Sequence, residues 1–405
     1  MRRILDLREE EVRRFPQAML LDAEILALTS SEKFEIEPAN LFNNYTHGLR
    51  SRGWVGQIPI GDELLIRVSP KVPVSNLFRM LEMAYNLRSF RLFDGEIQIE
   101  SLEDVYERIV SIVARRILDR ARKGLYRGYI GEADDLPYVR GHIDIVGAML
   151  NGIRGVPRIP CSYEEHTADL VDNRILLWTL HQVRRQALRQ EKVRIELDRA
   201  RRALAGTIAL EQCSPRDCVN RLYHRLNADY APMHGLCRFI LEQTGPDIQP
   251  GDEPFIPFEL NMPQLFETFV AEWLRANPLP SITVRCQYNA QLDANFEMKI
   301  HVDIVLCEES TQRPIAVLDT KYKASEQPSE ADIYQIAFYA RELEVDRAML
   351  VYPSKPASPF RILHGKEILL ESLVFDIGLT PDVAGAKFLD TLTAQLAIPR
   401  TSEAR

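Results

Sequence analysis

Several hallmarks of familiar protein classes are missing from this chain of 405 residues. Its six cysteines form no CxxC pair and none has zinc-finger spacing to a histidine, which argues against a zinc site. No apolar run reaches the roughly 18 residues of a membrane span, and the first residues, MRRILDLREEEVRRF, contain no apolar core of signal-peptide length. The GxxxxGK[ST] phosphate-binding loop is absent too. We therefore expect a cytoplasmic protein with reduced cysteines and no membrane contact, in which any nucleotide-driven motion must come from another polypeptide.

A net positive charge is also lacking, because 58 Asp and Glu against 50 Lys and Arg give a formal net charge of -8. This argues against a chain coated for non-specific nucleic-acid binding. Two stretches depart from the average: residues 108–127 carry seven Lys and Arg against the single acid Asp119, and residues 184–202 carry eight against three acids. Solvated helix faces explain each stretch alone. Together the two stretches permit a surface that follows nucleic-acid phosphates.

Hydrophobic periodicity divides the chain into three parts, and we predict a multidomain α+β fold. Residues 1–100 alternate apolar and polar positions between glycines, which predicts a β-rich N-terminal domain. Residues 101–245 have apolar residues at helical spacing, which predicts a helical middle region, interrupted by a Gly- and Pro-containing stretch at 124–155. Turn-forming residues gather at 244–257. The third domain, residues 255–405, follows them.

The third domain is predicted to be a mixed α/β sheet with flanking helices. Its opening segment, 263–277, has an apolar helical face. Segments rich in β-branched and aromatic residues predict strands, and one segment between the last two has helical spacing. The strands are expected at 281–292, 296–306, 314–324 and 347–353, and the helix at 331–344.

Three charged residues lie inside otherwise apolar strand segments of this domain. Asp303 lies in HVDIVL, and Asp319 and Lys321 lie in VLDTKYK. Side chains alternate along a strand, so Asp319 and Lys321 should share one face while Thr320 points away. A hairpin centred near Thr311 would set Asp303 opposite Asp319, with carboxylates about 5 Å apart that repel each other. A cation between them is expected.

A divalent cation bound between the two carboxylates would offset this repulsion. Mg²⁺ prefers one or two carboxylates together with waters and phosphate oxygens, so Asp303 and Asp319 are the predicted metal ligands, with Mn²⁺ as the alternative ion. Such an ion lowers the pKa of a bound water and stabilises charge on a phosphate, while Lys321 orients or deprotonates the water. The predicted reaction is phosphodiester hydrolysis. The alternative is a chance D-x-K triplet within an ordinary salt-bridge cluster.

Two more residues are candidates for the same site. Gln335 shares a helical face with Asp332 and Tyr339, so it can reach the end of the sheet and position water or phosphate. Its alternative role is that of an ordinary polar residue on a helix. Glu267 lies beside the apolar face of the opening helix, and it is either a ligand of the metal or water, or a solvated side chain.

These segments together resemble the McrC family, the cleaving subunits of modified-cytosine-dependent restriction systems within the PD-(D/E)xK nuclease superfamily. The resemblance rests on DIVL, LDTKYK and DIYQIAFYA, and extends upstream through VGQIPIGDELLIRVSPKV, NLFRMLEMAYNL, GLYRGY, LPYVRGHIDI and DNRILLWTL. The family pattern assigns Asp303, Asp319 and Lys321 to the catalytic motif and Gln335 to the glutamine of the following helix. Val302 stands where the family name has proline, a difference that leaves the ligands intact.

The resemblance implies a partner and a division of labour. The partner is a McrB-like AAA+ GTPase ring that recognises methylated DNA, while this chain cuts double-stranded DNA. Residues 1 to about 245 are then expected to dock on the ring and stimulate GTP hydrolysis, and an arginine such as Arg140 is a candidate for acting on the partner's nucleotide. Two other functions stay open: a PD-(D/E)xK nuclease in repair or defence without this partner, and an adaptor that docks without cutting.

Overall fold

The computed structural model describes most of the chain, in ranges separated by gaps. The described residues are 3–16, 19–38, 46–61, 63–85, 102–186, 188–219, 221–243, 258–291, 299–322, 328–356, 359–364 and 368–396. Contacts divide the chain into two compact units. Unit 1 comprises Met1–Val105 together with Ile256–Arg405, and unit 2 comprises Tyr106–Phe255. The expected division into three domains stays a prediction, and each unit is described by itself.

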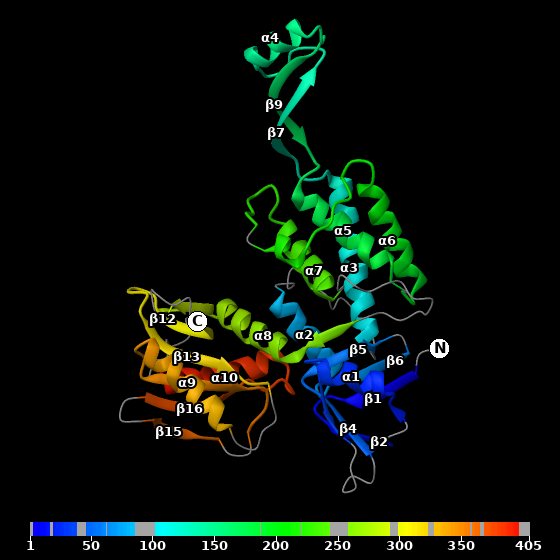
Figure 1. The fold of residues 1–405 in the computed structure, drawn as a ribbon. Coiled ribbons are helices and arrows are strands. Elements are labelled where there is room, and N and C mark those ends of the chain that lie inside the picture. Colours follow the sequence, from blue (N-terminus) through cyan, green and yellow to red (C-terminus); the bar gives the residue numbers. More distant parts are fainter. Residues whose placement is uncertain are drawn as a thin grey trace. The chain divides into compact units, whose positions relative to one another are not determined.

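Unit 1 contains the predicted β-rich part, whose strands form two sheets (Figure 1). The described strands of the first, here called the N-terminal sheet, are β1 (Arg3–Arg8), β6 (Leu64–Ser69), β5 (Trp54–Ile60) and β10 (Glu259–Asn261), in that order. Those of the second are β2 (Arg13–Pro16), β4 (Thr46–Ser51) and β3 (Phe34–Glu37). The helices α1 (Asp22–Ser30) and α2 (Val74–Ala84) accompany them.

Strand β10 comes from the far side of the linker, yet it pairs antiparallel with β5. The close approach depends on Gly56, whose φ is 118°. A Cβ atom built there would lie 1.9 Å from the carbonyl oxygen of Phe258, so only glycine fits without a backbone shift. Residues separated by some 200 positions in the sequence therefore share one sheet.

The rest of unit 1 is built on what we call the C-terminal sheet. Its described strands follow the order β11 (Ile282–Gln291), β12 (Lys299–Glu308), β13 (Pro314–Thr320), β14 (Arg347–Tyr352), β16 (Ile368–Val374) and β15 (Arg361–His364). The first three are antiparallel, whereas β13, β14 and β16 are mutually parallel. With α8 (Met262–Ala276) and α9 (Glu330–Glu342), the predicted order of helix, three strands, helix and strand is confirmed.

Helices hold this sheet in place through apolar contacts. Ile336 and Ala340 of α9 belong to the same core cluster as Val317 of β13 and Leu350 of β14. On α8, the ring of Trp273 packs edge-on against Phe388 of α10 (Pro381–Gln395), 6.3 Å between centroids. The apolar stripe predicted for α8 is therefore the surface by which it packs.

Unit 2 is mainly helical, as predicted. Its helices are most of α3 (Leu102–Lys123), α5 (Val171–Arg184), α6 (Glu191–Leu204) and α7 (Tyr230–Gln243), with a 3-10 turn at Pro215–Cys218. Its strands are β7 (Gly128–Leu136), β8 (His142–Ile143) and β9 (Ile159–Thr167), and α4 (Ile145–Ile153) follows β8. The stretch at 124–155 is thus more than an interruption: with β9 it forms an antiparallel arm that ends in α4 (Figure 1).

Two expectations from composition have structural counterparts. None of the helices in the described ranges combines the length and the apolar character that crossing a membrane requires. The cysteines are all free thiols, and five of the six are buried, Cys286 being partly exposed. The prediction of reduced, mostly buried cysteines agrees with this.

Candidate active site

The two predicted aspartates lie where β12 and β13 run side by side. The ladder between these strands pairs Ile304 with Leu318, and Asp303 and Asp319 are the next residue on each strand. The turn between the strands includes Thr311, as the predicted hairpin required. The expected pairing of the two acids therefore continues the register of the ladder.

Lys321 and Asp319 share one face, as strand alternation predicted. The Nζ atom of Lys321 lies 2.7 Å from Oδ2 of Asp319, whose side chain is buried with the residue 2% exposed. The backbone N–H of Lys321 donates to the carbonyl of Val351 at 2.8 Å, which ties this end of β13 to the parallel strand β14. A buried carboxylate and an amine are thus held together at the end of a central strand.

Thr320 contributes to the site, and the expectation that it points away from the acids is wrong. Its backbone N–H and its hydroxyl both donate to Oδ2 of Asp303, each at 2.8 Å. The last ladder pair before this point is Ile304 with Leu318, so Asp303 and Thr320 meet at the strand ends. Sequence alternation alone gave no signal for this contact. The two bonds fix the carboxylate of Asp303 beside Asp319.

Mutual repulsion and burial perturb the acids. Burial, then the charge of Asp303, raise the pKa of Asp319 to about 6, against the opposing effect of Lys321. Burial, then Asp303 and Asp319, raise the pKa of Glu267 on α8 to about 7, while a hydrogen bond from Gln287 lowers it. The charges of both aspartates therefore act on Glu267, and we call these three carboxyl groups the acidic cluster.

Helix α9 supplies the other polar partners of Lys321. The amine donates to Oε1 of Gln335 at 3.0 Å and lies 3.7 Å from Oδ1 of Asp332. Gln335 in turn donates through Nε2 to the hydroxyl of Tyr339 at 2.8 Å. The helix begins at a capping box formed by Ser329 and Asp332, which fixes its first turn. Gln335 is where it was predicted, and the i, i+3, i+4 spacing was the signal that also pointed to Asp332 and Tyr339.

The protonation state of Lys321 follows from these neighbours. Burial by itself lowers the pKa of the amine, but Asp319, Asp332 and Asp303 outweigh it, and the net pKa is raised above the ordinary value. Lys321 is therefore a cation at neutral pH. Of the two roles predicted for it, orienting a water or a phosphate fits this state better than deprotonating a water.

The donor set suits a hard divalent cation. Asp303, Asp319 and Glu267 offer only carboxylate oxygens, the ligands that Mg²⁺ and Mn²⁺ prefer. Within the described ranges, no three or more His, Cys, Asp or Glu side chains are already spaced as ligands of one ion. Asp319 Oδ2 is in contact with Lys321, so an ion bound there would share this oxygen with the amine. The residues fit a site with two carboxylates completed by waters.

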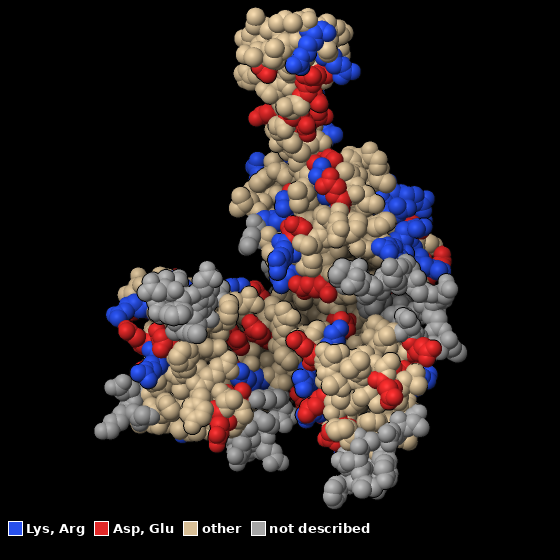
Figure 2. All heavy atoms as spheres, viewed as in Figure 1, with Lys and Arg blue, Asp and Glu red and all other residues tan. Residues whose placement is uncertain are grey.

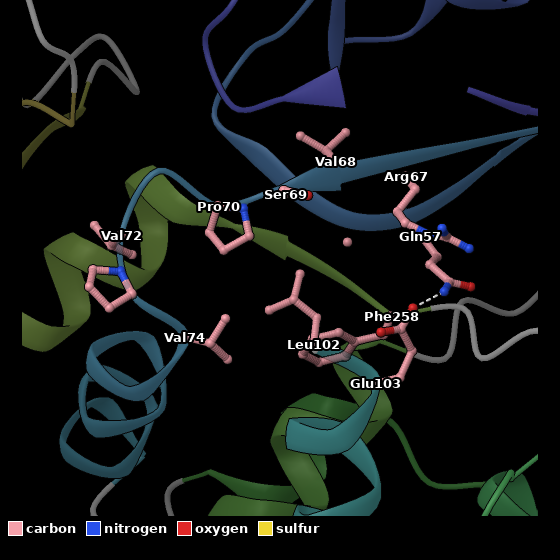
Figure 3. A pocket seen from close by; sticks show the side chains of 12 residues that line it. Gln57, Arg67, Val68, Ser69, Pro70, Val72, Val74, Leu102, Glu103 and Phe258 are labelled. Carbon is pink, nitrogen blue, oxygen red and sulfur yellow. Dashed lines mark hydrogen bonds between the residues drawn. The ribbon is translucent and has the colours of Figure 1, made fainter. Parts of the chain in front are cut away.

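Unit 1 also contains a cavity of about 300 Å³ (Figure 3). Gln57 and Glu103 face each other across part of its lining and are joined by a hydrogen bond from the amide to the carboxylate. Arg67 and apolar side chains, among them Val68 and Phe258, complete the wall. None of the five predicted site residues lines this cavity, so it is separate from the acidic cluster.

A solved structure with a similar chain supports the fold. A chain of the refined half-complex from the tetradecameric assembly of Thermococcus gammatolerans McrB AAA+ hexamers with bound McrC has a TM-score of 0.53 and 17% identity. The match covers 96% of the present chain and 100% of the other. A chain of the Thermococcus gammatolerans McrBC complex is 18% identical, with a TM-score of 0.44 over 68% of this chain and 88% of that chain.

Sequence comparison gives the family. No curated protein sequence matches this chain. Residues 49–353 match the family described as the McrBC 5-methylcytosine restriction system component. This span is well over half of the chain and includes Asp303, Asp319, Lys321, Gln335 and Glu267. The chain therefore belongs to the family of McrBC 5-methylcytosine restriction system components.

Proposed function

We propose that the chain is the DNA-cutting subunit of its restriction system, a Mg²⁺-dependent endodeoxyribonuclease of the PD-(D/E)xK type that acts in the cytoplasm. The observation that carries this proposal is the convergence of Asp303, Asp319 and Lys321 at the end of β13. Two neighbouring carboxylates in a largely buried setting are costly unless they bind something positive. A single ammonium group balances only part of their charge.

Each residue then has a role that its contacts support. Asp303, fixed by Thr320, and Asp319 would hold the cation, and Glu267 would bind a water of that ion or the ion itself. When bound, such an ion supplies a water of lowered pKa and stabilises negative charge on the scissile phosphate. Lys321, held by Asp319 and Gln335, would donate hydrogen bonds to the attacking water or to a phosphate oxygen. The P–O bond to the leaving oxygen breaks as the water oxygen bonds to phosphorus.

A partner is part of the proposal. The similar solved chain comes from an assembly of McrB AAA+ hexamers with bound McrC. By analogy, we infer that the present chain docks on a McrB-like GTPase ring and stimulates its GTP hydrolysis. The arm of unit 2 is suited to docking because α4 has no buried residue. Ile145, Met149 and Ile153, spaced by four residues, are 69%, 66% and 82% exposed. An apolar helix face left in water favours a protein partner.

Positive charge for DNA is available on unit 2. Lys and Arg side chains gather over α6 in the space-filling view (Figure 2). Burial, then the charges of Arg185, Arg201 and Arg184, lower the pKa of His181, so the positive charge of all three arginines acts on this residue. Such a cluster is suited to phosphate oxygens. The basic stretch at 184–202 thereby supports contact with DNA.

Two substitutions test the cutting role. Asp319→Asn removes one charge at nearly constant shape, and Lys321→Met removes the amine, so each should lower cleavage of methylated duplex DNA by at least about a hundredfold. Folding and ring binding should persist. Lys387→Met, at an exposed site on α10, is the matched control and should cut normally. Cleavage at the normal rate by both site variants would refute the proposal, and cutting without the ring would favour a nuclease that acts alone.

A further inference from the structure

Tyr322 is the residue directly after Lys321, and its side chain contacts residues outside the acidic cluster. It is 6% exposed, and its ring lies 5.8 Å from that of Phe266 on α8. Its hydroxyl donates to Oε2 of Glu9 at 3.4 Å, and Nζ of Lys71 lies 4.2 Å from its ring centroid. Glu9 follows β1 and Lys71 follows β6, so both belong to the ends of the N-terminal sheet. The residue after the candidate catalytic lysine is therefore held by a different sheet.

Glu9 is an unusual residue for the end of a sheet. It is 2% exposed, and its Oε2 accepts a hydrogen bond from the backbone N–H of Lys71 at 3.0 Å as well as the bond from Tyr322. Its Oε1 has no hydrogen-bond partner among the described residues. Burial raises the pKa of this carboxyl above its ordinary value. Burying such a group is unfavourable, and sheet pairing alone does not require a carboxylate here.

Lys321 needs external support because it lies past the end of β13. Its backbone makes the bond to Val351, and its amine is shared among Asp319, Asp332 and Gln335. A rotation of the backbone at Tyr322 would change the direction of the lysine side chain. Fixing the tyrosine ring between Lys71 and Phe266, with its hydroxyl on Glu9, restricts that rotation.

We propose that Tyr322 is a positioning residue for Lys321, and that the Glu9–Lys71–Tyr322 cluster makes the N-terminal sheet part of the support of the active site. The inference rests on the proposed function, because the reaction it serves is DNA cleavage. It assigns Glu9 and Lys71 no contact with DNA. Loss of the cluster should therefore lower the rate of the chemical step and leave the affinity for DNA unchanged.

The kinetic test uses the full chain assembled with its GTPase ring, in single-turnover cleavage of methylated duplex. Tyr322→Phe removes only the hydroxyl and should lower the rate constant about fivefold, which is the net effect of one hydrogen bond. Tyr322→Leu also removes the ring and should lower it further. The DNA concentration for half-maximal rate should not move. Tyr334→Phe is the matched control, because Tyr334 is exposed on α9, and it should cleave like the original protein.

The partner of the hydroxyl is tested by rescue and by non-additivity. Glu9→Gln keeps an acceptor oxygen and should retain most of the rate, whereas Glu9→Ala should match Tyr322→Phe. Combining Glu9→Ala with Tyr322→Phe should cost little more than either change alone, because both remove the same bond. Additive losses, or a normal rate in both folded Tyr322 variants, would overturn the proposal. So would a parallel loss of DNA affinity.

A second measurement does not depend on cleavage. The acetylation rate of Lys321 by an amine-reactive reagent, followed by peptide mass spectrometry, reports how firmly the amine is held. Tyr322→Phe should raise this rate several-fold, and Tyr334→Phe should not. An unchanged acetylation rate in Tyr322→Phe would refute the positioning role even if cleavage were never observed. If Tyr322→Phe raises the acetylation rate in a chain that does not cut DNA, the positioning role would stand and the proposed function would be refuted.

Discussion

The affinity of the acidic cluster for a divalent cation should depend steeply on pH. Burial and the charge of Asp303 raise the pKa of Asp319 to about 6 and that of Glu267 to about 7. A metal ion binds the ionised form of each ligand, so protons compete with it. Each pH unit below a pKa lowers the ionised fraction about tenfold. At pH 8 both groups are ionised, whereas at pH 5 roughly one tenth of Asp319 and one hundredth of Glu267 would be.

The size of the fall in metal affinity between pH 8 and pH 5 distinguishes two sets of metal ligands. If Asp319 and Glu267 both bind the ion, the affinity for Mg²⁺ or Mn²⁺ should fall by about three orders of magnitude from pH 8 to pH 5. If only Asp319 binds it, the fall should be about tenfold. Isothermal titration calorimetry of the full chain at four pH values measures this, with Glu267→Gln to isolate Asp319 and exposed Glu342→Gln as control. Equal affinity at pH 5 and pH 8, or unchanged binding by the Asp303→Asn, Asp319→Asn pair, would refute the reasoning.

The same pKa values predict how the metal-free protein loses stability. The carboxyl of Glu267 has a folded-state pKa of about 7 against an ordinary 4.5, so the folded protein holds a proton that the unfolded chain releases. Its contribution to stability is present below pH 4.5 and is lost as the pH rises through about 7. Asp319 acts in the same direction up to about pH 6. With a chelator, the melting temperature should therefore fall less on raising the pH in Glu267→Gln than in the original chain, and Mg²⁺ should restore it at pH 8.

Two further variants probe the arm and the packing of α8. Changing Ile145, Met149 and Ile153 together to serine should abolish co-elution with the GTPase ring without lowering the melting temperature, since these side chains are exposed. Retained co-elution would show that the partner binds elsewhere. Gly385→Ala should lower the free energy of unfolding by about 1–3 kcal/mol, because its Cβ would lie 2.0 Å from Cζ2 of buried Trp273. An unchanged urea midpoint would contradict the packing at this contact.

Local rules were enough to predict the central part of the candidate site. Alternation along a strand put Asp319 and Lys321 on one face, and a symmetric hairpin about Thr311 put Asp303 next to them. Helical spacing brought Gln335 to the same end of the sheet. Each of these inferences uses neighbours within about twenty residues, where the period of the element fixes side-chain direction. Charges in an apolar strand made the pattern visible.

The arm escaped prediction for a physical reason. Strand β7 contains three acids, Glu132, Asp134 and Asp135, and most of its residues are exposed. Because β7 buries none of its side chains, it has no alternation of buried apolar and exposed polar residues to detect. The backbone ladder with β9 holds it in place. The apolar positions of α4 have the spacing of a packed helix, yet none of them is buried in the described part of unit 2. Periodicity shows that a face is apolar, not whether its partner lies in the same chain.

Long-range contacts also determine whether the proposed nuclease part, residues 255–405, could be separated from the rest of the chain. Strand β10 pairs with β5, and this pairing requires glycine at position 56 because a Cβ atom there would clash with the backbone of Phe258. The amide of Asn76 on α2 donates to the carbonyl of Ile377 at 2.9 Å, and Tyr322 is held by Glu9. These contacts join residues more than 200 positions apart, so composition along the chain does not reveal them. A fragment starting near residue 255 would leave β10 unpaired and the support of Lys321 incomplete. The acidic cluster is best understood as a site of unit 1 as a whole, which is why a partner that binds the N-terminal sheet has a physical route to the lysine.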